Sequence, residues 1–185
     1  MRRISWKSKR IGIICFVIFI VYLCLRLTKQ TISTSAVFSN TKPVDVWEFV
    51  ADFSNMKSLN PTIKDFNILS EEGNFDEWKY SVEYKELLSH WPYTENINIG
   101  HFIVSPSGID YVINSTHKTC FLNGFFCLNS KGEFRFSPST HGTRCVEKVT
   151  FECPAIFSSY CKREAEFQRQ AIMDNLRIQF NPNSF

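Results

Sequence analysis

Alternation of apolar and polar residues marks strands through the middle of the chain. One face of the segment from Phe75 to Lys85 carries the large apolar residues, which are Trp78, Tyr80, Val82 and Tyr84. The opposite face carries charged and polar residues, and this period of two predicts a half-buried β-strand. Residues 63–70 predict a strand before it, with residues 71–74 as the hairpin turn between the two.

The alternation returns after a connection at residues 87–94. One face of the next strand carries three isoleucines and a histidine, which are Ile97, Ile99, His101 and Ile103. We expect His101 to face inward because it lies on the same face as the isoleucines. After a turn at residues 106–108, the alternation places Tyr111 inward and Asn114 toward solvent.

The last third of the sheet is less regular. Residues 116–129 fit either a strand with a bulge or a hairpin at the sheet edge. Residues 143–153 predict the last strand, on which Glu147 shares a face with Val149 and Phe151. Because burying an unpaired carboxylate is costly, we expect Glu147 to be paired, to contact a ligand, or to be turned outward by a bulge.

Two amphipathic helices flank these strands. The first is predicted to begin at Pro43, whose fixed φ suits the first helical position, and to break after Asp52 before one further turn. The second is predicted to begin at Pro154 and to run to about Phe180, with Arg169 outside its inward stripe. That stripe consists of Phe157, Cys161, Ala165, Gln168, Ile172 and Leu176. Its middle is small and polar, which leaves room beneath the helix.

An uncharged apolar run lies near the N-terminus, behind a basic cluster. We expect a basic cytoplasmic tail at residues 1–10, a transmembrane helix acting as a signal anchor at residues 11–27, and one domain at residues 28–185. This orientation predicts a single-pass membrane protein whose domain is luminal or extracellular, in the secretory pathway.

A cleaved signal peptide is the alternative interpretation of the same run. Thr34 and Ala36 are small residues that suit a cleavage site. Cleavage there would remove most of the first strand, which the sheet needs, so a retained anchor is favoured.

The charge of the chain limits its partners. The 185 residues fit one domain with a tail, and the formal net charge is +3. Five of the positive residues fall within the first ten positions, namely Arg2, Arg3, Lys7, Lys9 and Arg10. The remainder is about neutral, which argues against a nucleic-acid partner.

The cysteines fit an oxidising compartment. Five of them follow the apolar run, namely Cys120, Cys127, Cys145, Cys153 and Cys161. An odd number predicts one or two disulfides with a leftover thiol. Cys120 and Cys127 bracket an Asn-Gly turn and form the predicted pair, while buried apolar thiols are the alternative.

Other chemical signatures are few. Residues 114–116 read Asn-Ser-Thr, so Asn114 is a glycosylation acceptor if the domain is luminal. The sequence has no C-x-x-C motif, and the cysteine spacing fits no zinc template. We therefore expect neither a metal site nor a cofactor.

The start of the domain carries a recognisable combination. An extended run is followed by Pro-Val-Asp-Val-Trp-Glu-Phe-Val at residues 43–50, by Asp-Phe-Ser-Asn and by Leu-Asn-Pro. With Gly-Thr-Arg at residues 142–144 and the final helix, it resembles the START-like (Bet v 1-like, polyketide cyclase/dehydrase, SRPBCC) superfamily over about residues 31–180. The resemblance implies an α+β helix-grip fold, in which a curved antiparallel sheet of about seven strands grips the C-terminal helix over a hydrophobic cavity. A generic α+β domain without a cavity is the alternative.

Together with the predicted anchor, the resemblance implies a membrane-anchored binding domain for a hydrophobic small molecule or lipid. The candidate ligand-binding residues are Trp78, Tyr80, Tyr84, His101, Tyr111, Glu147, Phe151, Ala165 and Gln168. The candidate gate residues are Leu87, Leu88, Trp91 and Tyr93. They lie in the connection before the strand of His101 and face either the cavity mouth or a bilayer, unless this is an ordinary packed loop.

Two other function classes stay open. A cyclase or dehydratase would use His101, Glu147, Tyr80 or Tyr111 as acid or base, although no nucleophile motif supports a specific catalytic residue. A ligand-free adaptor would have a filled core. A large apolar cavity favours ligand binding, and convergence of His101 with Glu147 favours an enzyme.

Overall fold

The structure is a computed structural model that describes residues 6–181. Residues 1–5, half of the predicted basic tail, lie outside the described residues. The seven strands are β1 (Leu27–Ser39), β2 (Ile63–Gly73), β3 (Trp78–Leu88), β4 (Trp91–Ser107), β5 (Asp110–Phe121), β6 (Phe126–Ser139) and β7 (Gly142–Pro154). The helices are α1 (Trp6–Leu25), α2 (Pro43–Ala51), α3 (Phe53–Leu59) and α4 (Ser158–Phe180), with short 3-10 turns η1 (Leu122–Gly124) and η2 (Ala155–Phe157).

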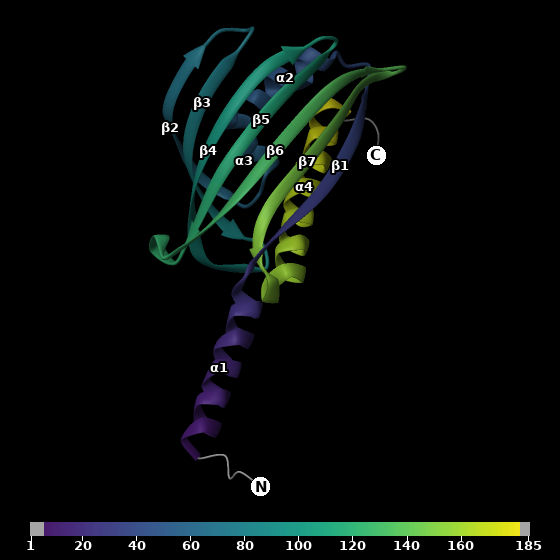
Figure 1. Ribbon diagram of the computed structural model, residues 1–185. Coiled ribbons are helices and arrows are strands. Elements are labelled where there is room, and N and C mark those ends of the chain that lie inside the picture. The colour runs from purple at the N-terminus through teal and green to yellow at the C-terminus, as the bar shows by residue number, and fades with distance from the viewer. Residues whose placement is uncertain (1–5, 182–185) are drawn as a thin grey trace.

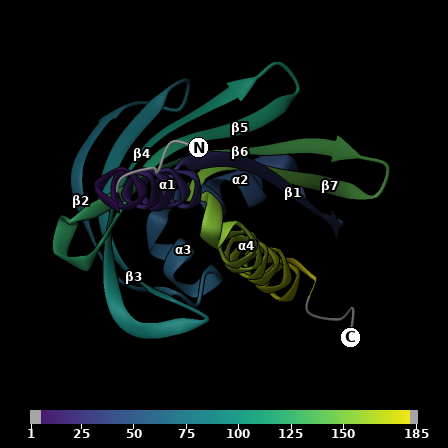
Figure 2. The same cartoon turned by 60° about the horizontal axis from the view of Figure 1, so that its bottom comes forward.

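The strands form one antiparallel sheet in the order β1-β7-β6-β5-β4-β3-β2. Consecutive strands from β2 to β7 are neighbours, and β1 closes the far edge beside β7. Figures 1 and 2 show the sheet curving around α3 and α4, which lie on its concave side. The predicted α+β class, the strand number and the grip on the C-terminal helix are confirmed.

The hairpin between β3 and β4 differs from the predicted connection at residues 87–94. Only Ser89 and His90 separate the two strands, and the register shifts between Leu87 and Leu88. The candidate gate residues therefore lie at the ends of two paired strands, because backbone pairing extends nearly to the turn.

The outward and inward faces of β4 are reversed relative to the sequence prediction. Asn96 and Asn98 are fully buried, while Ile97 and His101 are exposed. Pairing explains the reversal, because Asn98 lies opposite the buried Tyr84 and must share its face. The prediction that His101 faces inward is wrong, since burial of polar residues on this strand inverted the expected alternation.

The concave side is filled at one end by α2 and α3. Trp47 on α2 is 3% exposed, and its Nε1 donates to the Val112 carbonyl at 3.2 Å. Asp52 begins α3 by accepting a bond from the Ser54 amide at 2.9 Å. The short helix α2 therefore packs on the inner face of β5 and β6.

The C-terminal helix begins later than predicted. Pro154 ends β7, and η2 intervenes before α4 starts at Ser158. A disulfide between Cys153 and Cys161 joins the end of β7 to the first turns of α4. The leftover cysteine of the domain is Cys145, which is buried and free, and burial raises the pKa of its thiol.

The N-terminal helix also departs from the predicted range of 11–27. It ends at Leu25, and Leu27 already pairs with Pro154 as the first residue of β1. The Ala155 amide donates to the Arg26 carbonyl at 3.0 Å, which fixes this transition. Within the described part of the chain, no helix combines the length and apolar character that crossing a bilayer requires. The helix projects from the end of the domain at which α4 begins (Figure 1).

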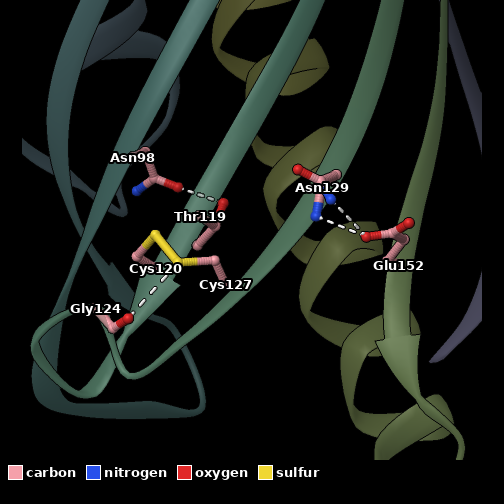
Figure 3. Close-up of a disulfide and its surroundings, with 7 residues drawn as sticks. All are labelled: Asn98, Thr119, Cys120, Gly124, Cys127, Asn129 and Glu152. Carbon is pink, nitrogen blue, oxygen red and sulfur yellow. Dashed lines mark hydrogen bonds between the residues drawn. A yellow bond between two sulfur atoms is a disulfide. The ribbon is translucent and has the colours of Figure 1, made fainter. Parts of the chain in front are cut away.

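Residues 116–129 form a hairpin, but not at the sheet edge. They comprise the end of β5, η1 and the start of β6, in the middle of the strand order. Cys120 and Cys127 lie directly opposite each other and form a disulfide, as Figure 3 shows. The predicted pairing is confirmed.

Candidate functional site

A cavity of about 740 Å³ lies between the inner face of the sheet and α4. This volume falls in the range of about 300–1,000 Å³ that small-molecule sites occupy. Small residues on its walls, among them Ser115, Gly132 and Ala165, leave the space that larger side chains would fill. The predicted room beneath the middle of the C-terminal helix is therefore present.

Most of the cavity wall is apolar. Phe53 and Met56 on α3 close its inner end, and Phe102 and Phe134 cover the sheet side. The aromatic ring of Phe53 lies 5.6 Å from that of Phe102. An apolar molecule placed here would replace water with hydrocarbon contacts on several sides.

Exposed apolar residues surround the outer end of the cavity. The exposed residues of this rim that also line the cavity are Trp91, Leu122, Phe126 and Phe157, and the half-buried Leu88 lies beside Trp91 in the same rim. They come from the β3–β4 hairpin, the η1 hairpin and η2, at the end from which α1 projects (Figure 2). Phe125, beside this rim in the η1 hairpin, is 89% exposed.

Five of the nine candidate ligand-binding residues line the cavity. They are Tyr84, Glu147, Phe151, Ala165 and Gln168. Tyr84 lies on β3, Glu147 and Phe151 on β7, and the other two on α4. The structure thus brings together residues that are far apart in the sequence.

The other three inward aromatic candidates pack elsewhere. The Tyr80 hydroxyl donates to the Ala51 carbonyl at 2.8 Å, and the Trp78 ring lies 4.8 Å from the Tyr80 ring. Tyr111 packs on Trp47 with ring centroids 4.9 Å apart. These residues form core rather than cavity wall, because α2 and α3 occupy that end of the concave side.

His101 lies on the outer face of β4. Its Nδ1 is 2.7 Å from the Ser81 hydroxyl oxygen, on the neighbouring strand. It borders a separate hollow of about 290 Å³. The convergence of His101 with Glu147 that would favour an enzyme is therefore not found.

The candidate gate residues are divided. Leu88 and Trp91 line the cavity, whereas Leu87 and Tyr93 do not. Tyr93 is 79% exposed and packs edge-on against Trp91 with ring centroids 5.4 Å apart.

Glu147 faces inward and is paired. Its Oε1 lies 2.7 Å from Nη1 of Arg169, while its Oε2 is buried without a hydrogen-bond partner. Burial raises the pKa of Glu147, and the guanidinium opposes that rise. The sequence prediction that placed Arg169 outside the inward stripe is wrong, because the long side chain reaches from the helix flank to this carboxylate.

A second buried carboxylate, Glu86, lies on the opposite wall. Its Oε1 accepts from the Thr62 hydroxyl at 2.7 Å and from Gln168 Nε2 at 2.6 Å. Its Oε2 accepts from Asn98 Nδ2 at 3.3 Å. Burial raises the pKa of Glu86, while these bonds and Arg169 counteract the rise.

Tyr84 and His117 meet within the cavity. The Tyr84 hydroxyl lies 3.1 Å from His117 Nδ1. Burial, together with the charges of Arg169 and His101, lowers the pKa of His117 to about 3. A neutral imidazole therefore faces the cavity at neutral pH. Gly100 permits this packing, because a Cβ there would lie 2.8 Å from the Phe102 ring and 3.0 Å from His117 Nδ1.

Glu164 on α4 holds the β3–β4 turn against the helix. Its Oε1 accepts from the Ser89 amide at 2.7 Å, and its Oε2 lies 2.8 Å from His90 Nδ1. Burial alone would raise the pKa of Glu164, but the hydrogen bonds from His90 and Ser89 lower it. We call Ser89, His90 and Glu164 the turn latch.

Several polar cavity residues were missed from the sequence, among them Glu86, His117, Glu152, Glu164 and Arg169. Glu86 follows Tyr80, Val82 and Tyr84 at a spacing of two, so the alternation on β3 could have identified it. The alternation gives no such signal for His117, because the sequence did not decide whether residues 116–129 form a bulged strand or a hairpin.

Polar contacts also hold the strands near the cavity mouth. Figure 3 shows Thr119 donating to Asn98 across β4 and β5, and Asn129 donating to Glu152 across β6 and β7. The Cys120–Cys127 disulfide lies between these contacts and the η1 turn. The hairpin that carries part of the rim is thus covalently closed.

No protein-family model and no curated protein matches the sequence, whereas many solved structures match the fold. TTHA0849 from Thermus thermophilus superimposes with a TM-score of 0.61 at 11% identity, over 85% of this chain and 100% of its own. Ara h 8.0201 gives a TM-score of 0.52 at 13% identity, over 80% of this chain and 98% of its own.

A third similar structure is the Zhui aromatase/cyclase from Streptomyces sp. R1128. Its TM-score is 0.54 at 13% identity, over 86% of this chain and 100% of its own. At such identities the likeness establishes the fold and not the activity. The seven-stranded sheet, the gripped C-terminal helix and these superpositions agree that the chain has the START-like, Bet v 1-like helix-grip fold.

Proposed function

We propose that this protein binds a hydrophobic small molecule or lipid in the cavity between the sheet and α4. The observation that carries the proposal is the mostly apolar cavity of about 740 Å³ with an apolar rim. Burying about 300 Å² of apolar ligand surface would contribute about 7 kcal/mol before entropy losses. An adaptor without a ligand would have a filled core, whereas the interior of this domain holds a large apolar cavity.

Native mass spectrometry of the full chain tests the proposal. The chain is purified without added lipid and released from detergent in the gas phase, and bound mass is compared with that of Ala165→Trp. The indole would occupy the cavity beneath α4. A co-purifying apolar compound that is lost in Ala165→Trp supports the proposal. Equal spectra for the two proteins, with no bound compound in either, would contradict it.

We also propose that α1 attaches the domain to a membrane. From Ile11 to Leu25 its described side chains are apolar and, apart from Cys24, exposed. A helix that is apolar on all sides needs an apolar environment. The helix and the rim lie at the same end of the domain, so the cavity mouth would face the lipid. Loss of membrane co-sedimentation after replacing Ile14, Ile18 and Tyr22 with Ser tests this.

The disulfides indicate the compartment in which the domain lies. Two disulfides suit an oxidising lumen or the outside of a cell. We therefore propose that the domain lies on that side. Labelling of the domain by a membrane-impermeant reagent in intact vesicles, before and after permeabilisation, tests the orientation.

A cyclase-like enzyme is the second candidate. Two observations favour it. Tyr84 and His117 form a hydrogen-bonded pair inside the cavity, and a similar structure is that of an aromatase/cyclase. A neutral imidazole beside a phenol can move a proton during an enolisation or dehydration. Mass analysis of the compound released after incubation separates the candidates, because a binding protein returns it unchanged.

A further inference from the structure

The charges around the cavity are unbalanced. Among the described residues that line it, Arg169 is the only Lys or Arg, while four carboxylates line the same walls. These are Glu86, Glu147, Glu152 and Glu164. A ligand that carries its own negative charge would enter a site where negative groups already predominate.

The positive charge of Arg169 is already paired with the carboxylate of Glu147. The Arg169 guanidinium lies 2.7 Å from Glu147, and both side chains are withdrawn from solvent, at 19% and 1% exposure. Pulling the guanidinium toward a ligand carboxylate would leave Glu147 buried and unpaired, which is strongly unfavourable. Arg169 therefore does not serve as an anion receptor.

The carboxylate oxygens keep unused acceptor capacity. Glu147 Oε2 has no hydrogen-bond partner, and Glu86 Oε2 has a single donor at 3.3 Å. A carboxylate oxygen can accept two hydrogen bonds. His117 is neutral at physiological pH because its pKa is lowered to about 3, so it adds no positive charge to balance these groups.

From this arrangement we propose that the cavity selects an apolar ligand whose polar end is a hydrogen-bond donor, either a neutral hydroxyl or an amine, and rejects an apolar carboxylate such as a free fatty acid. The inference rests on the proposed function and narrows its ligand class. The donor would reach the carboxylate of Glu86 or Glu147, while the apolar body lies against Phe53, Phe102 and Phe134 toward the rim.

Three probes that share one alkyl chain test the selection. Dodecanol, dodecylamine and dodecanoate are each titrated against full-length protein that holds the neutral dye Nile red, and loss of dye fluorescence reports displacement. We expect dodecanoate to bind at least about tenfold more weakly than dodecanol, a difference of about 1.4 kcal/mol. We expect dodecylamine to bind at least as well as dodecanol.

Variants identify the cause of the selection. Glu86→Gln removes a charge but keeps the shape, and we expect it to strengthen dodecanoate binding by at least about threefold. Glu166→Gln is the matched control, because Glu166 lies on the same helix as Arg169 but is exposed. Comparing each probe with itself between proteins removes differences in how the probes partition into detergent.

Two results would contradict this inference without contradicting the proposed function. One is dodecanoate binding as tightly as dodecanol, and the other is equal dodecanoate affinity in wild type and Glu86→Gln. A third result separates the two proposals: if no probe and no dye distinguishes wild type from Ala165→Trp, the proposed cavity function fails and this inference fails with it.

Discussion

Arg169 Nη1 and Glu147 Oε1 lie 2.7 Å apart, and this ion pair joins α4 to β7 beneath the sheet. Both groups are largely withdrawn from water, so each depends on the other for its charge to be tolerated. The pair therefore links the fold of the domain to the floor of its cavity.

Replacing Arg169 with Met should destabilise the domain by about 3–5 kcal/mol, because Glu147 would be left buried without a partner. Urea unfolding followed by intrinsic fluorescence measures the loss. Arg177→Met is the control, since its ion pair with Asp174 is more exposed and should cost less than about 1 kcal/mol. The double variant Glu147→Met/Arg169→Met should recover part of the loss. A cost for Arg169→Met no larger than the control would contradict this role.

The Cys153–Cys161 disulfide should contribute about 2–3 kcal/mol, because it closes a short loop between β7 and α4. Replacing both cysteines with Ser should lower the free energy of unfolding by that amount and lower the thermal midpoint. Differential scanning calorimetry measures both. Cys145→Ser is an unsuitable control because Cys145 is buried, so the variant with Cys120 and Cys127 replaced by Ser, which lacks only the other disulfide, provides the comparison. An unchanged midpoint would show that the packing of η2 alone holds the start of α4.

Much of this fold follows from local sequence patterns. The strand of Tyr80 and Tyr84 alternates strictly, and a proline marks the start of α2, so both were predictable from neighbouring residues. The Asn-Gly turn between Cys120 and Cys127 likewise identified a disulfide, because a turn brings its flanks together. These features depend on interactions within a few residues of each other.

The cavity was predictable only in part, because its walls depend on contacts between distant segments. Ala165 signals space from the sequence, but the sequence does not reveal that α3 fills the concave side near Tyr80. The inward face of β4 was misjudged for the same reason. Asn98 is buried because it meets Glu86 on the next strand, a partner that alternation along one strand does not reveal.

The half-buried His117 should make the domain sensitive to acid. Its pKa is lowered to about 3 by burial and by nearby positive charges, whereas in the unfolded chain it is about 6.5. The unfolded state therefore binds more protons between these values, so stability falls as pH decreases through this window. We expect a loss of about 1–3 kcal/mol, less than the full shift implies because water can enter the cavity.

Comparison with His117→Gln isolates this contribution. The buried carboxylates Glu86 and Glu147 have raised pKa values, so they act in the opposite direction, and both proteins share them. The difference in unfolding free energy between the two proteins should therefore change as pH falls from neutral toward the folded-state pKa of His117. Urea unfolding at several pH values measures it. Parallel pH profiles would contradict the prediction.

Asn114 should be glycosylated when the chain enters the secretory pathway. Its side chain is exposed on β5, and the acceptor triplet continues through Ser115 to Thr116. Expression in a eukaryotic secretory host should give a product heavier by one glycan, and treatment with an N-glycosidase should remove it. Thr116→Ala should abolish the shift, while Thr116→Ser should retain it. An unmodified chain that reaches the medium or the lumen would contradict the prediction.

The turn latch should set how fast a bound molecule leaves the cavity. Glu164 joins α4 to the turn before Trp91, whose side chain forms part of the rim. Glu164→Gln removes the charge that strengthens these hydrogen bonds, each worth about 1.5–3 kcal/mol when charged. We expect Nile red release, followed by stopped-flow fluorescence, to become about tenfold faster.

Acid should also speed release of the bound molecule. The latch lowers the pKa of Glu164, so its stabilisation is lost as the pH falls through the folded-state pKa of this carboxyl. Glu166→Gln should leave the rate unchanged, and equal release rates for both variants would mean that the hairpin is not the exit route.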